Sequence, residues 1–201
     1  MKLAHLIFIF FLAFANHSLA IEYGSYDPKK ILTVTKTENG NKYGIDLNYL
    51  DKIINDLASH AKSYPTKFDN ESDKNRAVSD TKILSGMPET LVNTPNPAPE
   101  ILRRTSLLNS IGHNLDISGA AQKADRDYQN LLRQLPNDPA INFGYGAFLG
   151  GANQGAKAIP YLEKSANSGY TDAYFSLGMV YLTQNKTELA LKNFEAYKKY
   201  N

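Results

Sequence analysis

Hydrophobic and polar residues alternate in two short runs between positions 31 and 47, and the pair Asn39-Gly40 separates the runs. The alternating apolar residues are Leu32, Val34, Tyr43, Ile45 and Leu47. A period of two is typical of a β-strand, and Asn-Gly favours a type I′ turn, so the sequence predicts a β-hairpin. Two strands are marginally stable alone, so we expect the hairpin to rest on the segment that follows it.

The segment after the hairpin changes to helical spacing. Its apolar stripe consists of Leu47, Leu50, Ile54, Leu57 and Ala61, and it predicts a helix that ends before Pro65. A second helix is expected to begin with Asp69 as its N-cap, because Glu71 and Asp73 follow in the first turn. Gly86 is expected to end this helix.

Four columns of residues recur in the C-terminal half of the chain at intervals of 34 and 32 residues. They are Ile111, Tyr145 and Leu177, each followed by glycine; Leu115, Leu149 and Tyr181; Ala124, Ala158 and Ala190; and Tyr128, Leu162 and Phe194. A helical hairpin of about 34 residues cannot bury its apolar face alone, so neighbouring hairpins must stack. The glycine is expected to let the two helices of a unit approach closely.

These columns resemble the tetratricopeptide repeat, and residues in the second and third units are also similar to the Sel1-like repeat. The residues similar to Sel1-like repeats include Lys157-Ala158, 161–166, Gly169, Ala173, Leu177-Gly178 and Tyr181. The resemblance covers about residues 105–201. It implies three tetratricopeptide-like helical hairpins in a short right-handed solenoid, with units at about 105–138, 139–170 and 171–201. Five glycines and Pro160 make the second unit intrinsically the least helical, so we expect its packing to be the loosest.

The expected fold class is therefore mainly α, with a small β-hairpin plus two-helix region ahead of the repeats. Residues 93–99 contain three prolines, which cannot continue a helix, and they are predicted to link the N-terminal region, 21–92, to the repeat array, 100–201.

Residues 1–20 have the pattern of a bacterial export signal. Lys2 gives a charged start, about ten apolar residues follow, and Ser18 and Ala20 are small residues at positions −3 and −1 of a cleavage site. We expect cleavage after Ala20 and a periplasmic or secreted protein without a stable membrane span. An uncleaved anchor is the alternative, but the apolar run is short for a span.

Composition removes several classes of chemistry. The chain has no cysteine, which excludes disulfides, thiol nucleophiles and cysteine-bound metal centres. The formal net charge is +2 and basic residues occur in runs of two at most, so nothing favours nucleic acid. After signal removal only His60 and His113 remain as histidines, too few for a multi-histidine metal site. We therefore expect no cofactor and no metal.

Acidic residues at 69–75 alternate like the start of a calcium loop. Lys74, however, occupies the position that needs glycine, and Asp80 stands where a bidentate glutamate belongs. Acids at a helix N-terminus explain the same residues. We expect no enzymatic activity, although a carboxylate pair assembled from distant residues stays open.

The resemblance implies a concave groove lined by the first helix of each unit. The implied partner-binding residues are Asn109, His113, Asp116, Phe143, Ala147, Phe175, Met179 and Leu182. Such a groove would hold an extended peptide or an amphipathic helix of a partner protein. The alternative is that the N-terminal region covers Phe143 and Phe175 as internal packing.

These observations predict a noncatalytic interaction module in the periplasm or outside the cell. A periplasmic immunity protein that inhibits a delivered toxin is one alternative, and a cell-wall glycan binder or an enzyme is another. Past Phe194 and Tyr197 the repeats lack a capping helix, so the last unit either presents a polar lysine face, forms a homodimer contact, or belongs to a longer natural chain.

Overall fold

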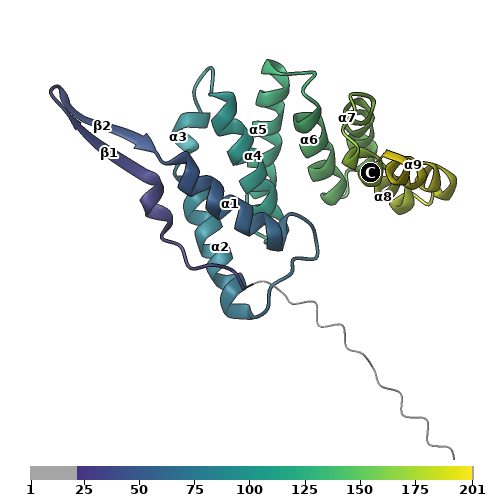
Figure 1. Cartoon of the computed structure of the whole chain (residues 1–201), viewed down its shortest axis with the longest axis horizontal. Helices are drawn as coiled ribbons and strands as arrows, with labels where there is room; N and C mark the ends of the chain where they lie inside the picture. The colour runs from purple at the N-terminus through teal and green to yellow at the C-terminus, as the bar shows by residue number, and fades with distance from the viewer. Residues whose placement is uncertain (1–21, 201) are drawn as a thin grey trace, which may run out of the picture.

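The computed structural model describes residues 22–200, so the predicted export signal lies outside the described residues (Figure 1). The elements in chain order are η1 Pro28–Ile31, β1 Leu32–Thr37, β2 Gly40–Ile45, α1 Leu47–Ala61, α2 Glu71–Gly86, α3 Glu89–Val92, α4 Pro99–Asn114, α5 Ala120–Gln134, α6 Pro139–Gly151, α7 Gly155–Asn167, α8 Asp172–Thr183 and α9 Thr187–Tyr200. The fold is mainly α. A two-stranded hairpin comes first in the chain and stacked helical hairpins follow it, as the sequence predicts. None of these helices is long and apolar enough to span a membrane.

The predicted hairpin forms, but two details of the prediction are wrong. Glu38 and Asn39 are the two turn residues between the paired strands, and neither has a positive φ. Within this turn only Gly40 does, with φ of 113°, so the connection is not a type I′ turn over Asn39-Gly40. The following segment also supports the hairpin only at its base, where Ile45 packs against the N-terminal core; β1 and β2 otherwise project away from the helices in Figure 1 and are exposed along almost their whole length. The apolar stripe expected to support the hairpin packs against η1, α2 and α4 instead.

Side-chain caps begin both N-terminal helices. Asp46 accepts a hydrogen bond from the Tyr49 N–H at the start of α1, and Asn70 accepts one from the Asp73 N–H at the start of α2. The expected cap at Asp69 is therefore wrong by one residue. Helices α1 and α2 share a core with Leu108 and Ile111 of α4 and with Leu115, which directly follows α4. The N-terminal region thus covers the outer side of the first repeat helix.

Tyr23 anchors the segment that precedes the hairpin. Its side chain is fully buried and its hydroxyl donates to Asp80 Oδ2 over 2.8 Å. The main-chain N–H of Tyr23 donates to Asp73, and Arg76 donates to the Tyr23 carbonyl. Burial raises the pKa of both the Tyr23 hydroxyl and the Asp80 carboxyl.

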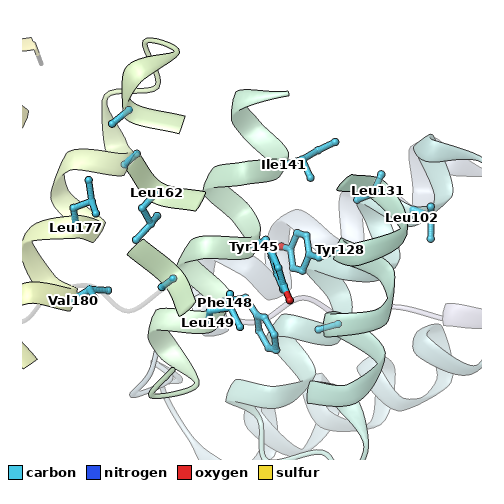
Figure 2. Packing of buried hydrophobic residues seen from close by; sticks show 14 of the residues in the cluster. Leu102, Tyr128, Leu131, Ile141, Tyr145, Phe148, Leu149, Leu162, Leu177 and Val180 are labelled. Carbon is cyan, nitrogen blue, oxygen red and sulfur yellow. The ribbon is translucent and has the colours of Figure 1, made fainter. Parts of the chain in front are cut away.

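Helices α4–α9 form three antiparallel hairpins around a second core. Most residues of the repeat columns are buried, but Ile111 and Leu115 lie in the core shared with α1 and α2, and Phe194 is half-buried. Ala124, Ala158 and Ala190 are almost fully buried, one in the second helix of each hairpin. Figure 2 shows the rings of Tyr128, Tyr145 and Phe148 gathered where α5 meets α6, and ring centroids lie 5.4 to 6.4 Å apart. Successive hairpins therefore share one continuous core.

The second hairpin is not loosely packed around its glycines. A Cβ added at Gly146 would lie 2.6 Å from Leu162 Cγ, and one at Gly144 would lie 3.0 Å from the Tyr128 hydroxyl oxygen. The same holds at Gly150, where an added Cβ would lie 3.0 Å from Val180. These glycines permit close approach, so the reasoning that low helix propensity would loosen this unit was wrong.

Candidate functional site

Helix α8 has two apolar faces. One face is buried and consists of Ala173, Leu177, Val180 and Tyr181. The other face is open to solvent, where Phe175 is 48%, Met179 is 43% and Leu182 is 47% exposed. Residues spaced four and three apart lie on the same side of a helix, so these three side chains form one strip. This exposed apolar strip is the candidate interaction surface on α8.

Two positions of the first two units that are equivalent to residues of this strip face the hairpin that follows them. His113 is equivalent to Met179, and its ring lies 5.9 Å from that of Phe148 on the next hairpin. Gly150 is equivalent to Leu182 and lies against Val180 of the next hairpin. The strip on α8 is therefore the surface onto which a further helix would stack, and within residues 22–200 no helix does so.

Helix α9 extends this apolar surface. Phe175 contacts two half-buried rings of α9, with centroid distances of 5.7 Å to Phe194 and 5.5 Å to Tyr197. Leu191 is 56% exposed, and its equivalent Asp125 accepts a 2.6 Å hydrogen bond from Tyr145 of the following hairpin. We call the surface formed by Phe175, Met179, Leu182, Leu191, Phe194 and Tyr197 the end face.

Asn109 does not line an open groove. It is 2% exposed, and its amide donates to Asp127 Oδ2 over 3.2 Å inside the first hairpin. Burial raises the pKa of Asp127, although Arg126 and Asn109 both donate hydrogen bonds to its carboxylate. Asn109 thus has a structural role in this polar cluster, and a partner in the groove would not reach it.

The other implied groove residues lie in three different settings. Phe143 is half-buried under Tyr170, with stacked rings 4.7 Å apart, so the covering residue comes from the loop before α8 and not from the N-terminal region. His113 and Ala147 are half-buried, and Asp116 is exposed in the turn after α4. Of the eight residues, the structure brings only Phe175, Met179 and Leu182 together as one open apolar surface.

Comparison with known proteins gives partial matches. No family model matches the chain. Over 96 residues the chain is 33% identical to human aspartyl/asparaginyl beta-hydroxylase and 31% identical to the mouse protein of that name. The match covers 48% of this chain but spans only 12% and 13% of the two relatives.

Two solved structures of MamA resemble the fold. Their TM-scores are 0.48 and 0.47 at 16% identity, and each match covers 77% of this chain and 78% or 73% of the MamA chain. The stacked hairpins and their glycine and alanine columns define the architecture. It is a tetratricopeptide-like fold.

The acidic residues at the start of α2 act as structural groups in this fold. Asp73 is buried, accepts from the Tyr23 N–H and pairs with Arg76 at 3.0 Å.

Glu89, at the start of α3, also has a structural role. It pairs with Arg126 and Lys123, and these partners hold its pKa below the usual value despite partial burial. Across the part of the chain that the structure describes, no group of three or more His, Asp or Glu side chains is placed to hold a metal ion.

Sequence reasoning placed Phe194 and Tyr197 on a possible homodimer contact of the last unit but not in the partner-binding groove, and it missed Leu191 altogether. The signal was present, since Leu191 shares a column with Asp125 and Ile159, but a column position alone does not say which neighbour covers it. The contact between Asp125 and Tyr145 supplies that information.

Proposed function

We propose that this protein is a noncatalytic protein–protein interaction module that binds an amphipathic helix on its end face. The observation that carries the proposal is the strip of Phe175, Met179 and Leu182, which is 43 to 48% exposed on one side of α8. A helix-binding surface needs apolar anchors at helical spacing, and the strip provides three. Rings at the centre of such a surface contribute most of the binding energy.

The internal stacking of the repeats supports a helical partner. On the first hairpin, α6 covers the surface equivalent to the end face and places Phe148 beside His113. On the second hairpin, α8 covers it and places Val180 between Gly150 and Gly155. A partner helix with a bulky apolar residue at the corresponding position would reproduce this packing between Met179 and Leu182.

The titratable groups with shifted pKa support a noncatalytic role, since they hold the fold together. Asp127 and Asp80 are buried among internal hydrogen-bond partners, and Asp138 pairs with Arg103 at 2.7 Å between successive hairpins. Perturbed carboxyl groups that serve catalysis are expected in a cleft that a substrate can enter. These carboxyl groups have protein partners of their own.

We also propose that the protein works in the periplasm after cleavage behind Ala20. The support is the charged start, short apolar run and small residues of positions 1–20. Mass spectrometry of the protein isolated from a periplasmic fraction should show Ile21 as the N-terminal residue. An N-terminus at Met1, or recovery with the membrane fraction only, would contradict this location.

The binding surface is tested by a crosslinking pulldown from the periplasm with three forms of the protein. They are the wild type, a Phe175→Ala and Met179→Ala double variant, and a Val34→Ala and Tyr43→Ala control variant, whose substitutions remove apolar side chains that are even more exposed but lie on the hairpin. We expect the control to keep the partner and the end-face variant to lose it, with affinity at least about tenfold weaker when measured with the purified partner. Equal binding by both variants would exclude the end face.

A further inference from the structure

We infer that a second copy of this chain occupies the end face, so that the end faces of two copies pack together around a two-fold axis. This inference rests on the proposed function, because it names the partner for the same surface. Phe175, Met179, Leu182 and Leu191 supply the apolar centre of the contact.

The two ends of the repeat array differ, and this difference determines how two copies can meet. At the N-terminal end, α1 and α2 pack against α4, and Leu108, Ile111 and Leu115 lie in their shared core. Arg104 of α4 also forms a bidentate pair with Asp51 of α1, at 2.7 and 2.8 Å. Figure 1 shows α1 and α2 beside α4, at the opposite end of the array from α8 and α9.

Head-to-tail stacking would need the end face of one copy to meet an open N-terminal end of the next. That end is already occupied by the copy's own helices. Between two copies of this chain, the open apolar surface can therefore be matched only by the identical surface of the other copy, and the resulting contact is isologous. An isologous contact closes after two copies and forms no filament.

The charges of α8, α9 and the turn between them suit contact between identical surfaces. Acidic and basic exposed residues are mixed there: Asp172, Glu188, Glu195, Lys186, Lys192, Lys198 and Lys199. Three acidic residues against four basic ones leave a charge near zero, so two identical faces do not repel each other strongly. The sequence also has no cysteine, so the contact depends on packing and not on a disulfide.

Sedimentation equilibrium of the purified full chain measures the association directly. We expect the wild type to reach the mass of two chains and no more as its concentration rises. A Met179→Glu and Leu191→Glu double variant should weaken dimerisation at least about tenfold, because it places unpaired charges in an apolar contact. Both side chains are about half exposed in one copy, so the fold should be unchanged, which far-ultraviolet circular dichroism would verify.

A matched control places the same charges on the hairpin. A Val34→Glu and Tyr43→Glu variant should dimerise like the wild type. If instead this variant is monomeric and the end-face variant dimerises, the hairpin forms the contact and the inference is wrong. A wild type that stays monomeric also overturns it. If the wild type is monomeric but the Phe175→Ala and Met179→Ala variant loses the periplasmic partner, the proposed function still holds. If that variant keeps the partner, both the dimer inference and the proposed function are wrong.

A mixing experiment separates the two-fold contact from head-to-tail stacking. In a two-fold contact each copy uses the same face, so the charged end-face variant should bind labelled wild type more weakly than the wild type binds itself. In head-to-tail stacking the charged variant would still present an intact N-terminal end. Full-strength capture of the wild type by the variant would therefore exclude the two-fold arrangement.

Discussion

Replacing Gly146 by alanine tests whether close helix approach holds the second hairpin together. The added methyl would lie 2.6 and 2.8 Å from Cγ and Cδ2 of Leu162, and 3.2 Å from the Leu162 main-chain nitrogen. Leu162 is fully buried, and its Cγ is a branch point and not the far end of a flexible chain. The side chain therefore cannot make room by a rotation of its tip, and α6 and α7 must move apart.

The magnitude follows from two opposing effects. Overpacking a filled core costs about 1–3 kcal/mol, and this site belongs in the upper half of that range because a main-chain atom is also close. Replacing glycine by alanine inside a helix gains about 1 kcal/mol from backbone entropy. We expect Gly146→Ala to lower the free energy of unfolding by roughly 1–2 kcal/mol.

Gly151→Ala is the matched control, because it adds the same methyl to the same helix where nothing lies within 4 Å. It should leave stability unchanged or raise it by about 0.5 kcal/mol. Urea unfolding followed by circular dichroism would compare both variants with the wild type. If Gly146→Ala is as stable as Gly151→Ala, close approach at this column does not hold the hairpin together and our reading of the glycines is wrong.

Two further substitutions test the buried polar groups. Tyr23→Phe removes the hydroxyl that donates to Asp80 and should lower the free energy of unfolding by about 1–3 kcal/mol. Ser25→Ala is the exposed control in the same segment. Equal urea midpoints for the two variants would show that the Tyr23–Asp80 hydrogen bond contributes nothing to stability. Burial raises the pKa of Asp127, so the folded state binds its proton more tightly than the unfolded state does, and this carboxyl's contribution to stability falls as pH rises from 3.8 to its raised folded pKa. The stability of Asp127→Asn relative to the wild type should accordingly increase with pH over that interval in urea titrations, and an unchanging difference would contradict the raised pKa.

The repeat columns could be read from the sequence because they record strong steric constraints. A glycine where two helices touch and an alanine where they cross allow few substitutes, so the spacing of Gly112, Gly146 and Gly178 survives in three units. The β-hairpin could also be predicted, since alternation and a turn sequence are local signals. The exposure of both strands could not be predicted, because local alternation carries no information about what packs against a strand.

The candidate site was predictable only in part for the same reason. The residues of α8 could be named from their column, but whether a column is open depends on the neighbour. Asn109 and Phe175 occupy equivalent positions, yet Asn109 is buried beside Asp127 and Phe175 is 48% exposed. Sequence spacing gives the direction in which a side chain points along the array, and only the structure shows whether a following hairpin is present to cover it.

The order of the repeats explains why the apolar surface collects at one end of this protein. Each unit has the same positions on its first helix, and in the first two units His113 is covered by Phe148 of the next hairpin and Phe143 by Tyr170 of the loop before α8. The third unit places Phe175, Met179 and Leu182 there, larger apolar side chains than a solvent-facing end of the array needs. Solenoid surfaces that face water are polar, as in capping repeats, whereas this face of the third unit is apolar. This apolar composition is the reason we propose that the end face binds a partner.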